Sequence, residues 1–193
     1  MLQIVKYFIF SIIFMCIFFT SCKEATLEER LAATNGTNFS IKRFIYNQWK
    51  ANAGKPFVIL KTIKIDGKVD SSYSNSDTLN WNEIFDVFYE TDISDKKYVG
   101  HYKFNQIEDK EDQTINLMLD ASEDDFFVRK FMLSIDMNTE KVRGIYIETF
   151  KHSALGEVQQ KLYYAPMRTV QIQTYEDPLI GTKKNKIVQY YFL

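Results

Sequence analysis

Residues 57–74 read FVILKTIKIDGKVDSSYS, and this stretch decides which fold the sequence is expected to adopt. Its first half alternates in the way that is typical of a β-strand with one buried face. The residues expected on that face are Phe57, Ile59, Ile63 and Ile65. Asp66-Gly67 follows, and this pair favours a tight two-residue hairpin turn. The stretch therefore predicts an antiparallel hairpin whose second strand lies near residues 69–74.

Similar runs of alternating or apolar residues recur in the second half of the chain. They fall at 97–107, 113–120, 126–135, 142–151, 157–164, 168–175 and 186–193. Polar or charged turns separate them at short, regular spacing, which favours an antiparallel meander. With the hairpin included, about nine strands are expected, and a sheet of this size predicts strong curvature, as a half-barrel or a closed barrel.

An amphipathic helix is expected directly before the hairpin. Ser40 is a favourable N-cap, and Phe39 and Phe44 occupy the two positions of a hydrophobic staple. Gly54 and Pro56 mark the end of the helix. Between these signals, apolar residues recur at helical spacing, at Ile41, Phe44, Ile45 and Trp49. This stripe could bind a partner, but packing against the chain's own sheet is the simpler interpretation.

A second helix is expected over residues 80–90, with Asn80 as its cap. Its apolar side chains follow the spacing i, i+3, i+4 and i+7, at Trp81, Ile84, Phe85 and Phe88. Two helices packed on one antiparallel sheet define an α+β fold class. We expect a single domain of this class over residues 39–193.

The N-terminus has the features of an export signal. Residues 1–6 form a short basic start, and residues 7–19 are almost entirely apolar. This apolar run is shorter than the ~20 residues that span a bilayer, which disfavours a transmembrane anchor. Small side chains then lead through Ser21 to Cys22, whose thiol is a group that lipid can alkylate. The other cysteine, Cys16, lies in the signal region, so the mature chain would form no internal disulfide.

This N-terminus resembles the lipobox signal peptide of bacterial lipoproteins. The resemblance implies cleavage between Ser21 and Cys22 and attachment of lipid to Cys22. It divides the chain into a signal peptide (1–21), a lipidated cysteine with a tether (22–38) and the domain (39–193). The lipid would anchor the protein in the bacterial cell envelope, where we expect the outer membrane. Two alternatives stay open: an ordinary signal peptide with an incidental cysteine, and an uncleaved anchor.

A weaker resemblance rests on the general composition. The abundance of Phe, Tyr, Ile, Lys and Asn, with strings such as IET at 147–149 and KLYY at 161–164, is similar to uncharacterised lipoproteins of Bacteroidota. That similarity implies no activity. The expected architecture also resembles lipoprotein-localisation carriers, whose concave sheet holds acyl chains, and lipocalins, which close a barrel around a ligand. The lipocalin opening Gly-x-Trp is missing from this sequence, which favours the carrier type.

The charge balance argues against nucleic acid as a partner. The chain has 24 basic and 25 acidic residues, and loss of Lys6 with the signal peptide leaves a formal charge of about -2. A nucleic-acid-binding domain would need a basic surface to neutralise phosphates. We therefore expect no nucleic acid among the partners.

No group of residues is distinguished as a catalytic or metal site. Both histidines, His101 and His152, are expected on strands, where a surface position is the simplest interpretation. Acidic runs at 108–112, 123–125 and 136–140 lack EF-hand spacing and its central glycine, so we expect solvated turns. Carboxylates that could pair for glycosidic cleavage include Asp86, Glu90, Asp92 and Glu148. No pair among them stands out, and we expect no cofactor, metal or catalytic residue.

The functional expectation follows from the anchor and the sheet. The leading hypothesis is a non-enzymatic, lipid-anchored envelope protein that binds a lipid, another hydrophobic ligand or a partner protein. One alternative is an envelope hydrolase acting on glycan or peptide, and another is a structural accessory subunit of an envelope complex. An apolar concavity would favour the first, convergent carboxylates the second, and an exposed aromatic patch the third.

Overall fold

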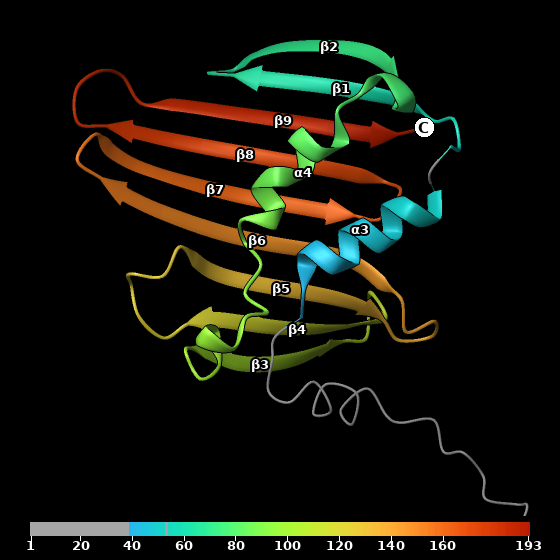
Figure 1. Ribbon diagram of the computed structural model, residues 1–193, viewed down its shortest axis with the longest axis horizontal. Helices are drawn as coiled ribbons and strands as arrows, with labels where there is room; N and C mark the ends of the chain where they lie inside the picture. The colour runs from blue at the N-terminus through green and yellow to red at the C-terminus, as the bar shows by residue number, and fades with distance from the viewer. Residues whose placement is uncertain (1–38, 53) are drawn as a thin grey trace, which may run out of the picture. The chain divides into compact units, whose positions relative to one another are not determined.

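The computed structural model describes residues 39–52 and 54–193. The expected signal peptide, lipidation site and tether, residues 1–38, lie outside the described residues. Within the described part the chain forms nine strands and two α-helices (Figure 1). The α+β prediction with about nine antiparallel strands is confirmed.

The helices and strands have the following bounds. The helices are α3 (Ile41–Asn52) and α4 (Trp81–Tyr89), and short 3-10 turns lie at Ser76–Thr78 and Lys96–Tyr98. The strands are β1 (Val58–Ile65), β2 (Lys68–Asn75), β3 (Tyr102–Asp109), β4 (Thr114–Ala121), β5 (Val128–Asp136), β6 (Val142–Ser153), β7 (Gly156–Ala165), β8 (Thr169–Pro178) and β9 (Lys184–Phe192).

All nine strands belong to one antiparallel sheet in the order β2-β1-β9-β8-β7-β6-β5-β4-β3. Strands β3 to β9 form a meander, and the early hairpin joins its end because β1 pairs with β9. The sheet is open, with β2 and β3 as its two edges. Of the two predicted forms, the closed barrel is therefore wrong, since closure would need the far edges of β2 and β3 to pair with each other.

The hairpin that opens the sheet forms as predicted. Strands β1 and β2 pair throughout, with Ile65 opposite Lys68 across the turn. Asp66 and Gly67 both have positive φ, 48° and 88°, as a type I′ turn requires. This geometry matches the right-handed twist of the strands, so the Asp-Gly pair sets the register of the hairpin.

One strand begins later than expected. The sequence pattern predicts a strand from residue 97, but Lys96–Tyr98 is a 3-10 turn and β3 begins at Tyr102. Asp95 explains the difference, because its side chain accepts a hydrogen bond from Lys97 N and so caps a turn. A local side-chain cap competes here with the β-propensity of the residues that follow.

Both helices begin at the predicted caps. Ser40 Oγ accepts from Arg43 N at 3.2 Å, and the rings of Phe39 and Phe44 lie 5.4 Å apart, as in a hydrophobic staple. Asn80 Oδ1 accepts from Glu83 N at 3.4 Å at the start of α4. Capping thus fixes where α3 and α4 start.

The two helices cover one face of the sheet and form the core with it (Figure 1). On the sheet side the fully buried residues include Ile59, Ile145, Ile147, Leu162, Tyr164 and Val170. Tyr164 lies at the centre, with its ring 5.5 Å from Phe85 of α4 and 6.3 Å from Phe44 of α3. Burial raises the pKa of the Tyr164 hydroxyl, and nearby Tyr89 adds to the shift. The aromatic stripes of both helices therefore pack inward.

Candidate functional site

The helix-bearing face of the sheet is covered unevenly. A cross-strand row of apolar side chains runs over it through Ile63, Val188, Ile172, Leu162 and Ile147. Leu162 and Ile147 are fully buried, whereas Ile172 and Val188 are only half-buried. Further along β1 on the same face, Ile65 is 46% exposed. The helices therefore leave open one end of the part of this face that β1, β9 and β8 form, whereas Ile59, Tyr190 and Val170 further along the same strands are buried.

A cleft of about 310 Å³ lies in this open part, between the start of α4 and the three strands. Its apolar lining consists of Leu79, Ile84, Ile172 and Val188. Its polar lining consists of Lys61, Asn80, Glu83, Thr174, Lys186 and Tyr190. The hollow thus combines apolar walls with two cations and several hydrogen-bonding groups.

Two lysines dominate the charge of the cleft. Lys61 Nζ lies 5.6 Å from the ring centroid of Tyr190, within the range of a cation–π interaction. Neither Lys61 nor Lys186 forms an ion pair with a carboxylate in the part of the chain that the structure describes. Burial raises the pKa of Tyr190, and the negative charge of Glu83 raises it further. With two lysines against one glutamate, the cleft keeps positive charge available to a ligand.

Sequence reasoning missed both lysines. Lys61 lies on the same face of β1 as Ile59 and Ile63, because successive side chains of a strand point to opposite faces. A lysine at a position where the alternation predicts a buried apolar residue could therefore have indicated this site. Lys186 carries no such signal, since its place opposite Ile65 depends on the pairing of β1 with β9.

A polar row continues from the cleft across the next strands. Lys186 pairs in register with Thr174, and Gln160 and Thr149 follow on β7 and β6. Gln160 Nε2 donates to Thr174 Oγ1 at 3.5 Å, and Thr149 Oγ1 donates to Gln160 Oε1 at 3.4 Å. These hydrogen bonds replace the water that the side chains of Gln160, Thr174 and Thr149 lose on a partly covered face. The row separates the apolar core from the exposed end of the sheet.

This arrangement suits an amphipathic anion. An acyl chain would contact Ile172, Val188 and Ile84, and each buried methylene contributes about 0.8 kcal/mol. Its acid group would meet Lys186 or Lys61, which supply charge-assisted hydrogen bonds.

A larger hollow of about 550 Å³ lies where β6 extends past the start of β5. It is lined by Glu90, Asp124, Asp125, Phe127, Arg129, Phe150, Lys151 and His152. The structure thus brings together Glu90, His152 and two residues of the acidic run 123–125, which the sequence pattern leaves far apart. Arg129 Nη1 lies 3.2 Å from Asp124 Oδ1, and its guanidinium lies 5.1 Å from the ring centroid of Phe150. This carboxylate is already paired with a cation.

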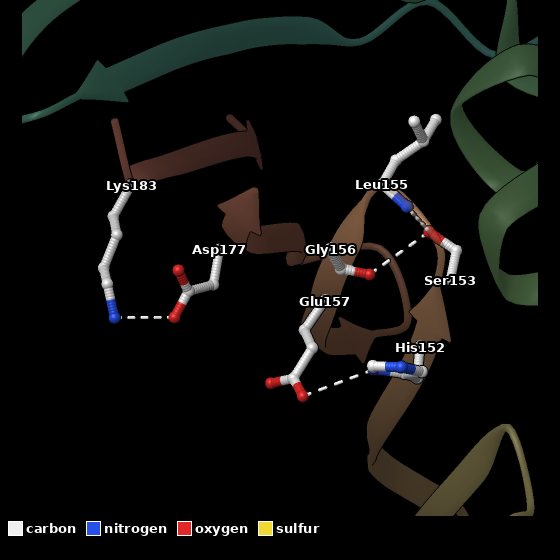
Figure 2. Close-up of polar contacts among 7 residues, drawn as sticks. All are labelled: His152, Ser153, Leu155, Gly156, Glu157, Asp177 and Lys183. Carbon is white, nitrogen blue, oxygen red and sulfur yellow. Dashed lines mark hydrogen bonds and ion pairs between the residues drawn. The ribbon is translucent and has the colours of Figure 1, made fainter. Parts of the chain in front are cut away.

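His152 pairs with Glu157 on the neighbouring strand (Figure 2). Its Nδ1 lies 3.4 Å from Glu157 Oε1, and the two side chains are 73% and 50% exposed. Ser153 Oγ donates to the carbonyl of Gly156 at 3.2 Å and accepts from Leu155 N at 3.3 Å. The serine hydroxyl therefore stabilises its own turn, and the pair formed by His152 and Glu157 does not extend to it.

The remaining candidates lie apart from one another. The ring of His101 packs on Phe126 at 5.1 Å. Asp136 caps its hairpin turn by accepting from Asn138 N and Thr139 N at 3.1 and 2.9 Å, and these hydrogen bonds hold the pKa of its carboxyl below the ordinary value. Asp92 accepts from Ser40 Oγ at 2.6 Å.

Glu148 accepts from Tyr146 on the opposite face of the sheet, so it does not converge with Asp92. Burial raises the pKa of the Tyr146 hydroxyl, and its hydrogen bond to Glu148 raises it further. No cluster of three metal-ligating side chains occurs in residues 39–52 and 54–193.

The face without helices carries several exposed tyrosines. Tyr73 is 71% exposed, and Tyr163, Tyr175 and Tyr191 are each 37% exposed. Each of the last three has a polar partner on one side, because Tyr163 pairs with Gln171, Tyr175 with Gln159 and Tyr191 with Thr169. On the other side Tyr163 pairs with Tyr146, and Tyr191 pairs with Leu60, which also pairs with Tyr73. Two small aromatic groups therefore lie on this face, one at Tyr146 and Tyr163 and one around Leu60.

No model of a known protein family matches this chain, and no curated protein matches it. Among the described helices, none is both long enough and apolar enough to cross a bilayer.

Proposed function

We propose that this chain is a non-enzymatic, lipid-anchored protein of the bacterial outer membrane that binds an amphipathic anion carrying an acyl chain. The open sheet acts as a half-barrel, and the cleft beside α4 holds the ligand. One observation carries the proposal: two lysines without carboxylate partners among the described residues border apolar walls. A charged lipid matches both features, because its acid group can pair with the lysines and its acyl chain can contact the apolar walls.

The anchor is supported by the sequence before the domain. Apolar residues 7–19 end at Ser21-Cys22, the arrangement that resembles a lipobox. Cleavage would leave Cys22 as the lipidated first residue, and two or more acyl chains hold a protein stably on a membrane. The anchor keeps the cleft close to a supply of its ligand.

Titration with a fluorescent fatty acid tests the cleft. We expect the full chain to bind the probe and Lys186→Glu to weaken binding by about tenfold, which corresponds to about 1.4 kcal/mol. Lys184→Glu is the matched control, since Lys184 lies on the same face of β9 but outside the cleft lining. Its affinity should stay within about twofold of the wild type, because Lys184 does not line the cleft.

A second variant tests the apolar walls. Ile172 is half-buried and lines the cleft, so Ile172→Asp places a charge where the acyl chain would lie. We expect loss of probe binding, while Gln171→Asp on the opposite face should bind normally. Equal affinities of Lys186→Glu, Lys184→Glu and the wild type would contradict the cleft as the binding site. Hydrolysis of a glycan or peptide without probe binding would favour the enzyme hypothesis.

A further inference from the structure

Two neighbouring turns at one end of the sheet expose three large aliphatic side chains. Leu155 lies in the turn between β6 and β7 and is 83% exposed. Leu179 and Ile180 follow β8 and are 78% and 90% exposed. Single exposed apolar residues are common, but three together on adjacent turns form a surface that usually has a partner.

The two turns are joined through their backbones. Leu179 N donates to the carbonyl of Leu155 at 3.0 Å. Gly156 lets the chains approach, because a Cβ at this position would lie 2.4 Å from the carbonyl oxygen of Asp177. Ser153 Oγ bonds to both Leu155 N and the Gly156 carbonyl (Figure 2). The apolar side chains therefore project from a single hydrogen-bonded element, which we call the double turn (residues 151–155 and 178–184).

The charge of the double turn is positive. It contains Lys151, Lys183 and Lys184 and no aspartate or glutamate. Three acidic residues lie just outside it: Asp177 pairs with Lys183 at 2.6 Å, Glu157 lies 3.4 Å from His152, and Glu176 lies opposite Lys184 in the strand register (Figure 2). Aliphatic side chains bordered by lysines complement the acyl boundary and the phosphates of an anionic bilayer.

We infer that the double turn docks this domain onto an anionic membrane surface, with Leu155, Leu179 and Ile180 inserted at the level of the head groups. A bilayer accepts separate aliphatic side chains without a shaped groove, and lysines around them extend their stems towards phosphate. This contact is independent of the ligand cleft, because none of the three aliphatic residues lines it. It would orient the domain against the membrane, whereas an N-terminal lipid alone only tethers it.

Quenching by brominated phospholipids tests the insertion. The full chain is reconstituted in vesicles of phosphatidylethanolamine and phosphatidylglycerol with brominated acyl chains, and Ile180→Trp is compared with the wild type. We expect about a twofold loss of the fluorescence added by the new indole, because an inserted ring contacts the acyl chains. Tyr73→Trp is the matched control, since Tyr73 is 71% exposed on the edge strand β2, outside the double turn.

The outcomes separate the possible partners. Quenching of Ile180→Trp but not Tyr73→Trp supports the docking surface. Equal quenching of both variants, or of neither, overturns it. An envelope protein that covers the double turn in the absence of lipid would also overturn it.

A charge variant then tests the lipid class. Replacing phosphatidylglycerol by phosphatidylcholine, or combining Lys183→Gln with Lys184→Gln, should reduce quenching of Ile180→Trp by about twofold. Unchanged quenching in both experiments would overturn the anionic surface as the partner. Fatty-acid binding in the cleft should be unaffected by these lysine substitutions, so failure of this inference is distinguishable from failure of the proposed function.

Discussion

Trp49 of α3 and Trp81 of α4 pack against each other with their ring centroids 4.2 Å apart. Trp81 also stacks on Phe192 of β9 at 5.4 Å and donates from Nε1 to the carbonyl of Ser76 at 2.6 Å. One indole thus joins both helices to the sheet. Because Trp81 is the first residue of α4, its packing also sets where the helix meets the cleft.

Trp81→Ala should therefore destabilise the fold and weaken the ligand site together. We expect a loss of about 3–5 kcal/mol in the free energy of unfolding, as for other buried aromatics, measured by urea denaturation followed by circular dichroism. Tyr46→Ala on α3 is the control, because Tyr46 is 59% exposed and its removal should cost less than about 0.5 kcal/mol. Similar losses for both variants would contradict this role of Trp81.

Asp92 should make the stability depend on pH below neutrality. Burial acts to raise its pKa, but hydrogen bonds from Ser40, Ser94 and Lys42 outweigh burial and hold the pKa below its ordinary value. The stabilisation is thus complete above the unfolded pKa of about 3.9 and is lost as the pH falls through the lower folded pKa.

Unfolding of Asp92→Asn at a series of pH values measures this effect. We expect the variant to be less stable than the wild type near neutral pH, with the difference shrinking below about pH 4. Asp77→Asn, at an exposed position, should show little difference at any pH. If the difference in stability between Asp92→Asn and the wild type stayed the same in strong acid, the charge of the carboxylate would not be its cause.

Gly156→Ala should be more costly than an alanine at another glycine of positive φ. At Gly67, where φ is 88° and no atom lies within 4 Å of an added Cβ, only backbone strain of about 1–2 kcal/mol is expected. At Gly156, φ is 131° and the Cβ also meets the backbone of Asp177 and Pro178. Overpacking should add about 1–3 kcal/mol, measurable by urea denaturation. Equal losses of stability for Gly67→Ala and Gly156→Ala would contradict this prediction, because they would show that β7 and β8 accommodate the added Cβ without cost.

Intact-mass spectrometry of protein extracted from membranes tests the N-terminal prediction. We expect a mature chain that begins at Cys22 and carries the added mass of its acyl chains. Native spectra of the same preparation should show a bound lipid if the cleft is loaded. An unmodified Cys22 would reject the lipid anchor and leave the ordinary signal peptide or the uncleaved segment as the explanation.

Local signals in the sequence were sufficient for most of the secondary structure. Asp66-Gly67 specified a type I′ hairpin, and Ser40 and Asn80 specified helix starts, because each acts through bonds or dihedral angles within a few residues. The start of β3 was misjudged, since the cap formed by Asp95 overrode an apolar run. The apolar spacing of both helices also correctly indicated which of their faces are buried.

The sequence by itself determined the α+β class, the hairpin and the two amphipathic helices. Only the tertiary structure decided that β1 pairs with β9, that the sheet stays open, and that Lys61 and Lys186 border one cleft. It also decided that Leu155 and Leu179 lie side by side. The physical reason is the same in each case: strand pairing joins residues far apart in the chain, and no local propensity or periodicity encodes which edges meet.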